Sequence, residues 1–114
     1  MKSWRIKFIS ALTAMAICIG TIGAQTKDLP FLKKNESYAK VRNKLLKAGW
    51  EPFHADDADE CQPGDLRCEN RPEMQSCAGT GMANCKFLWK RKGKTLAIFT
   101  VGEDAVYSGH EFEK

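Results

Sequence analysis

The stretch "CKFLWKRKGKTLAIFTVGE", residues 85–103, contains two apolar runs with "RKGK" between them. Short apolar runs on either side of a glycine-containing turn predict a β-hairpin, with Lys92 and Gly93 at the centre of the turn. In the first strand, Phe87 and Trp89 are two residues apart and therefore share a face. The second strand offers apolar groups on both faces, which is typical of a central strand.

Less structure is expected after this hairpin. Val106 and Tyr107 predict a short edge strand. The remaining "SGHEFEK", residues 108–114, is expected to be a loose tail.

A helix is predicted before the hairpin by "NESYAKVRNKLLKAGW", residues 35–50. Its apolar residues recur at helical spacing and form a stripe of Tyr38, Val41, Leu45 and Ala48. Asn35 or Ser37 can cap the first turn, and Gly49 stands where a left-handed C-terminal cap belongs. The opposite face is lined by Lys40, Lys44 and Lys47. The apolar stripe is therefore expected to pack on the core.

Between the helix and the hairpin, residues 50–65 predict a short strand followed by an acidic loop. His54 and the three aspartates after it do not match the glycine-containing calcium loop, so no metal is expected there. "RPEMQSC", residues 71–77, predicts one turn of helix after Pro72. The predicted fold is α+β: one helix packed on a three- or four-stranded antiparallel sheet, with a disulfide-tied crossover loop.

The N-terminus has the layout of a secretory signal peptide. Three basic residues, at positions 2, 5 and 7, precede an apolar run at 8–24 that ends in the small residue Ala24. That run is about 17 residues long, the lower limit for a membrane span, so an uncleaved anchor is the alternative. Ile17 stands before Cys18, where lipoprotein processing favours a small residue. We expect a signal peptide at 1–24 and a single small periplasmic or secreted domain at 25–114.

Four cysteines remain after residue 24: Cys61, Cys68, Cys77 and Cys85. An even number in a short exported chain predicts two disulfides. The gaps of six, eight and seven residues are wider than those of structural zinc sites and do not form a C-x-x-C redox motif. Four cysteines allow three pairings. The favoured pairs are Cys61 with Cys68 and Cys77 with Cys85, because each closes a short loop around turn-forming residues.

The charge of the chain is segregated along its length. Without residues 1–24, 15 basic and 14 acidic residues leave a net charge of +1. Residues 27–47 carry +5, residues 51–73 carry −6, residues 86–94 carry +5 and residues 103–114 carry −3. These blocks are expected to be solvated faces, and internal pairing or contact with a partner are the alternatives.

Two resemblances add to these patterns. "LPFLKKNESYAKVRNKLLKAGWEPF", residues 29–53, resembles the opening of a PASTA module, in which a proline-containing strand leads to a helix ending in Ala-Gly and then to another strand. The cysteine-tied second half departs from that pattern. "YAKVRNKLLKAGWEP" together with "CAGTGMANCKFLW" is similar to a group of small exported proteins of Gram-negative bacteria without established function. That likeness implies no chemistry.

The sequence does not favour catalysis, because His54 and His110 are not part of a recognisable Ser, His and Asp spacing. We expect a non-catalytic periplasmic binding or inhibitor module, including the immunity type, whose partner is an unidentified protein. The alternative is a module that binds peptidoglycan or another anionic envelope polymer through Lys86, Lys90, Arg91, Lys92 and Lys94. No cofactor, metal or nucleic acid is expected, and membrane contact is expected only through the signal segment.

Overall fold

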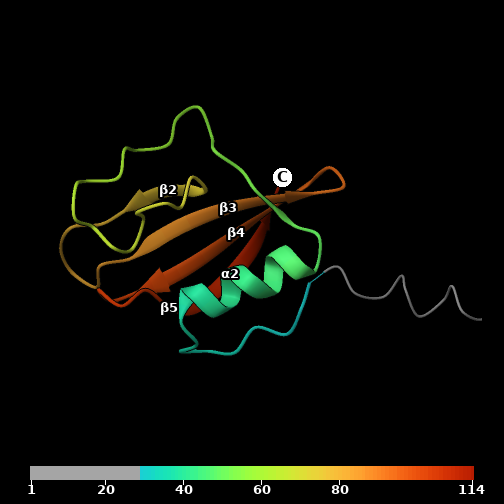
Figure 1. Cartoon of the computed structure of the whole chain (residues 1–114), viewed down its shortest axis with the longest axis horizontal. Helices are drawn as coiled ribbons and strands as arrows, with labels where there is room; N and C mark the ends of the chain where they lie inside the picture. The colour runs from blue at the N-terminus through green and yellow to red at the C-terminus, as the bar shows by residue number, and fades with distance from the viewer. Residues whose placement is uncertain (1–28) are drawn as a thin grey trace, which may run out of the picture.

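A five-stranded sheet forms the centre of the molecule, and the one helix of residues 29–114 lies across one of its faces (Figure 1). The computed structural model describes residues 29–114, so the expected signal peptide and Cys18 lie outside the described residues. The elements are α2 (Tyr38–Lys47), β1 (Glu51–Pro52), β2 (Met74–Cys77), β3 (Cys85–Arg91), β4 (Lys94–Val101) and β5 (Val106–Glu113). The α+β prediction is confirmed, with five strands instead of three or four. No helix in the described part is long and apolar enough to cross a membrane.

The sheet has the order β1-β3-β4-β5, and β2 lies beside β1 along the same edge of β3. β1 pairs with the C-terminal end of β3, with Glu51 opposite Lys90, and β2 pairs with the N-terminal end, with Cys77 opposite Cys85. All these pairings and those of β3 with β4 and β4 with β5 are antiparallel. The chain between β1 and β2 is therefore a long crossover, as expected.

The β3–β4 hairpin forms as its sequence predicts. Arg91 pairs with Lys94, and Lys92 and Gly93 make the turn with φ of 49° and 79°. Positive φ at both central residues is what a two-residue turn needs to match the twist of its strands. β4 lies between β3 and β5, and its buried residues include Leu96, Ala97 and Ile98. The prediction of a central strand is confirmed.

The helix α2 has the predicted caps. The Ser37 hydroxyl accepts a hydrogen bond from the Lys40 backbone N–H, so Ser37 is the N-cap. Gly49 has a φ of 92°, and the N–H of Trp50 donates to the Leu45 carbonyl at 3.0 Å, which turns the chain back over the helix. The predicted stripe faces the sheet, where Tyr38 stacks on Phe87 with ring centroids 3.9 Å apart.

The other face of the sheet is covered by the start of the crossover, residues 53–55. Leu88 of β3 and Ala97 of β4 are buried under Ala55, with Phe53 and Phe99 packed beside them. Both faces of the central strands are therefore withdrawn from water, which explains the apolar residues on both sides of β4.

A buried ion pair connects the helix to the strand region before β2. Glu73, with 0% of its surface exposed, accepts hydrogen bonds from Arg42 and from the Tyr38 hydroxyl at 2.7 Å. The Trp89 indole N–H donates in turn to the Tyr38 oxygen at 3.1 Å. Burial raises the pKa of Tyr38 well above its usual value, and the adjacent Glu73 carboxylate adds to the effect.

Two local predictions are wrong. Residues 74–77 form the strand β2 and not a turn of helix, because their backbone pairs with β3 through the Cys77 and Cys85 positions. Residues 108–113 are not a loose tail, because β5 continues to Glu113. In β5, His110 pairs with Ile98 and Phe112 with Leu96, so strand pairing with β4 orders the segment.

Candidate interaction site

Two disulfides close two loops at the end of the molecule that contains β2. Cys61 bonds to Cys68, and Cys77 bonds to Cys85, with Cα atoms 5.7 Å and 4.0 Å apart. These are the pairs that the sequence favours. The first loop belongs to the crossover, and the second connects β2 to β3. We call residues 61–68 and 77–85 together the double loop.

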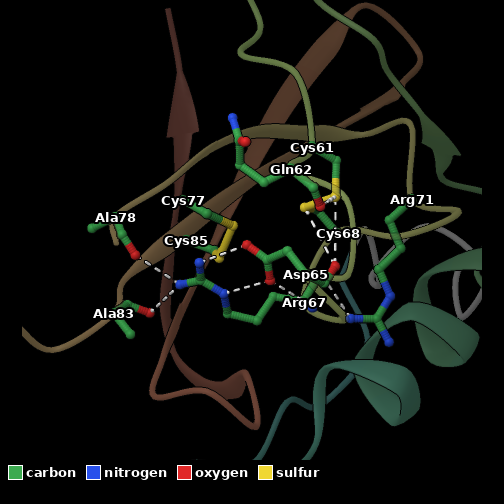
Figure 2. Close-up of polar contacts among 10 residues, drawn as sticks. All are labelled: Cys61, Gln62, Asp65, Arg67, Cys68, Arg71, Cys77, Ala78, Ala83 and Cys85. Atoms are coloured by element: carbon green, nitrogen blue, oxygen red, sulfur yellow. Dashed lines mark hydrogen bonds and ion pairs between the residues drawn. A yellow bond between two sulfur atoms is a disulfide. The ribbon is translucent and has the colours of Figure 1, made fainter. Parts of the chain in front are cut away.

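A single side chain joins the two halves of the double loop (Figure 2). The Arg67 guanidinium binds both carboxylate oxygens of Asp65, with Nε to Oδ1 at 2.8 Å and Nη2 to Oδ2 at 2.7 Å. Its Nη1 donates to the carbonyls of Ala78 at 2.8 Å and Ala83 at 3.3 Å in the other loop. A planar fork of donors can satisfy a carboxylate and two carbonyls at once, which a lysine ammonium cannot do with the same geometry. Arg67 therefore holds the second loop at a fixed position against the first.

The charges at this junction neutralise each other. Hydrogen bonds from Arg67 lower the pKa of Asp65 below its usual value, and the Asp65 carboxylate raises the pKa of Arg67. Asp65 is therefore ionised at neutral pH and already engaged. A carboxylate in this state is suited to holding a loop and not to transferring a proton.

The double loop presents two large apolar side chains to solvent. Leu66 is 73% exposed, and Met82 is 68% exposed. Leu66 and Ala83, the residue after Met82, line one hollow together with Glu103. Each apolar side chain is thus carried by a covalently closed loop, and the two loops are connected through Arg67.

The surroundings of the double loop are acidic. Asp59 and Glu60 line a second hollow beside Cys68 and Cys77. The exposed acidic residues next to the double loop, by sequence or by shared hollow, are Asp59, Glu60, Glu69 and Glu103. The nearby cation Arg71 donates to the carbonyl of Arg67 at 2.9 Å and stacks on Tyr38. The exposed apolar residues are therefore bordered by negative charge.

A group of metal-ligand residue types also lies here, but its chemistry does not fit a metal. Donor atoms of Asp65, Cys68 and Cys77 lie within 4.8 Å of one another. Both cysteines are in disulfides, so neither sulfur is the thiolate that binds zinc. The acidic loop is braced internally: the Gln75 amide donates to Asp57, and a ring nitrogen of His54 lies 3.0 Å from the Pro72 carbonyl.

The basic residues predicted as a binding patch do not form one surface. Lys86 makes an ion pair with Glu113 at 2.8 Å. The Lys90 ammonium lies 4.3 Å from the centre of the Phe53 ring, and Lys90 is paired with Glu51 across the sheet. Arg91 points to the other face, where its Nε lies close to Gly49. Lys92 and Lys94 are exposed at the turn.

The histidines do not assemble a catalytic group. His110 Nδ1 lies 2.7 Å from the Tyr107 hydroxyl, and His54 contacts a backbone carbonyl. Within residues 29–114, neither histidine has a carboxylate as a hydrogen-bond partner. The arrangement of base, carboxylate and nucleophile that hydrolases use is not built around either of them.

Several residues of the double loop were not identified from the sequence. The cysteines were, but Asp65, Leu66, Arg67 and Met82 were not. One signal was present: "DLR" places a carboxylate and a guanidinium two residues apart inside a closed loop. The contacts of Arg67 with residues 11 and 16 positions away carry no local signal.

Comparison with known proteins adds no identity, because no family model, curated protein or solved structure matches this chain. The two disulfides point to an oxidising environment outside the cytoplasm.

Proposed function

We propose that this protein is a non-catalytic binding module of the periplasm or the exterior, and that it binds and inhibits a partner protein through the double loop. The observation that carries this proposal is the presentation of Leu66 and Met82 on two disulfide-closed loops joined by Arg67. An immunity-type role, in which the partner is an enzyme that attacks the cell envelope, is the form we favour.

Preorganisation is the physical reason. A flexible loop loses conformational entropy on binding, and constraining it beforehand strengthens binding by reducing that loss. The centre of a typical protein interface is apolar, and its rim is polar. The exposed apolar side chains of the double loop and the polar residues around them match this arrangement. A domain that only binds a partner needs no mobile catalytic loop, so rigid disulfide-closed loops are compatible with its function.

The acidic surroundings restrict the partner. Asp59, Glu60 and Glu103 next to two apolar residues favour a positively charged surface that contains an apolar depression. Complementary charge raises the association rate, and the apolar contact slows dissociation. We therefore expect a basic partner whose binding weakens as salt is added.

Site-specific photocrosslinking in the producing cell tests this proposal. Benzoylphenylalanine replaces Leu66, Met82 or, as the control at the opposite end of the sheet, Lys92. The expected result is the same crosslinked protein from positions 66 and 82, absent from position 92. It should disappear when Cys77 and Cys85 are replaced by serine. Equal crosslinking from all three positions, or none from 66 and 82, would contradict a binding role for the double loop.

A second function, binding to peptidoglycan or another anionic envelope polymer, rests on the exposure of Lys90, Lys92 and Lys94 at one end of the hairpin. The pairing of Lys86 with Glu113 reduces the charge available for it. Co-sedimentation with purified sacculi tests this function. Unchanged co-sedimentation after replacement of all five basic residues by glutamine would show that the hairpin is only a solvated turn.

A further inference from the structure

The outward face of α2 is strongly basic. The helix contains no acidic residue, and its buried side is formed by Tyr38, Val41 and Leu45. Lys40 and Lys47 lie on the opposite side and are exposed. Arg42 does not contribute to this face, because its guanidinium binds the buried Glu73.

The segment before the helix adds an aromatic residue to this face. The Lys44 ammonium donates to the Phe31 carbonyl at 3.0 Å and lies 5.9 Å from the centre of the Phe31 ring. Phe31 is 79% exposed, more than any other large apolar side chain of the described residues. Most of the apolar area of this ring is therefore available for burial against another surface.

The balance of charge on this face is positive. Its members are Lys33, Lys34, Lys40, Lys44 and Lys47, with Phe31 beside them; we call this set the helix basic face. The one acidic residue among them is Glu36, which pairs with Lys44 at 2.7 Å. Hydrogen bonds from Lys44 and from the Lys33 backbone lower the pKa of Glu36, so it stays ionised and removes one of the five positive charges.

We propose that the helix basic face binds the surface of an anionic lipid bilayer, with Phe31 entering the headgroup region. Each lysine close to an anionic membrane surface contributes to binding, and one aromatic residue adds an apolar contact. This peripheral contact is separate from any made by the N-terminal leader. An anionic bilayer is favoured over an anionic polymer because the most exposed apolar residue of the described chain lies among the lysines.

The helix basic face and the double loop are different surfaces of the domain. In Figure 1, α2 lies across one face of the sheet, and β2 lies in the sheet beside β3. Cys68 and Cys85 of the double loop pack into the same core cluster as the buried side of α2, whereas Lys40 and Lys47 lie on the opposite side of the helix. The two surfaces share no residue, so either proposal can fail alone.

The test uses the purified exported protein and two kinds of vesicle, one of phosphatidylethanolamine with phosphatidylglycerol and one of phosphatidylcholine alone. Replacing Lys40 and Lys47 with glutamine should weaken binding to the anionic vesicles about 25-fold, from roughly fivefold for each lysine. Phe31→Ser should weaken it about tenfold. The matched control replaces Lys92 and Lys94 with glutamine and should change binding less than about twofold. All substituted residues are exposed, so the fold should be retained, as circular dichroism can verify.

Three results would overturn the lipid proposal. The first is equal binding of the unsubstituted protein to both kinds of vesicle. The second is an equal loss for the α2 pair and the hairpin pair. The third is co-sedimentation with purified sacculi that depends on Lys40 and Lys47, together with no binding to anionic vesicles, which would assign the face to a polymer. Comparing variants on one vesicle type cancels any contribution of the leader.

Discussion

Replacing Glu73 with alanine should cost more stability than any substitution at an exposed carboxylate. The Glu73 side chain has 0% exposure and accepts hydrogen bonds from the Tyr38 hydroxyl at 2.7 Å and from Arg42 at 2.6 Å and 3.1 Å. The change removes the acceptor for all three while leaving the donors in place. It therefore tests whether this network fixes the helix against the sheet.

The size of the effect follows from the burial of each partner. Removing one member of a buried ion pair costs about 3 to 5 kcal/mol, because the remaining charge is left without compensation. The Arg42 side chain is 26% exposed and can turn toward water, which places the cost in the lower half of that range. The Tyr38 hydroxyl is buried and cannot do the same. We expect a loss of about 3 to 4 kcal/mol, a large share of the roughly 5 to 10 kcal/mol of a small domain.

Urea unfolding followed by the fluorescence of the buried Trp50 and Trp89 measures the loss. With a slope of roughly 1 to 1.5 kcal/mol/M, the midpoint should fall by about 2 to 4 M. Glu69→Ala, at an exposed position, is the matched control and should shift the midpoint by less than about 0.5 M. A double-mutant cycle with Arg42→Ala should give a coupling of more than about 1 kcal/mol. A loss below about 1 kcal/mol, or one equal to that of Glu69→Ala, would refute the reasoning.

Four further predictions concern the double loop and the helix end. Arg67→Gln removes four side-chain hydrogen bonds near the surface and should lower the free energy of unfolding by about 1 to 2 kcal/mol. It should also speed amide exchange in residues 77–85, and unchanged exchange there would show that Arg67 does not hold the loop. Replacing Cys77 and Cys85 by serine should cost about 2.5 kcal/mol in urea unfolding, the entropy of opening a short loop, and a cost near zero would contradict that origin. The pKa of Asp65 is lowered in the folded state, so its stabilising contribution is complete above the unfolded pKa of about 4 and is lost as the pH falls through the folded pKa. Asp65→Asn should therefore flatten the pH dependence of the urea midpoint below about pH 4. An unchanged slope would count against the ion pair with Arg67. Gly49→Ala should cost about 1 to 2 kcal/mol in thermal unfolding because φ is 92° there, and a stabilised variant would mean that the cap adopts another conformation.

The elements that could be predicted from the sequence are those whose signals are local. The helix repeats its apolar residues every three or four positions, and the β3–β4 hairpin contains its own turn. The start of β5 at Val106 and Tyr107 was predicted as an edge strand, but its continuation to Glu113 was not. Ser108, Gly109 and Glu111 resemble a polar tail until pairing with β4 is known. β2 was missed for the same reason. Proline before a glutamate favours a helix start locally, whereas the backbone of Glu73 accepts a hydrogen bond from Leu88 at 2.8 Å, in a strand 15 residues later.

In the candidate site too, features with a local sequence signal could be predicted, and features that depend on distant contacts could not. The disulfide pairs follow from cysteine spacing, because both are closed within short segments. The Arg67 contacts cross from one loop to the other and depend on the path of the crossover. The basic hairpin shows that residues close in sequence need not be close on the surface. Successive side chains of a strand point to opposite faces, so Lys90 and Arg91 separate on folding.

Some of the charged residues in these sequence blocks pair with each other in the fold, and the others remain exposed. Arg42 with Glu73 and Lys86 with Glu113 pair residues from blocks of opposite sign, so part of the charge is consumed internally. The rest stays exposed and is sorted by position, with lysines on α2 and carboxylates around the double loop. The net charge of +1 over residues 25–114 is therefore the sum of a basic surface on α2 and an acidic surface around the double loop. Such an arrangement orients the molecule in an electric field near a charged surface, even though no net attraction acts on it at long range. Inverting the charge of α2 should therefore alter membrane binding without altering the affinity of the double loop for its partner in solution.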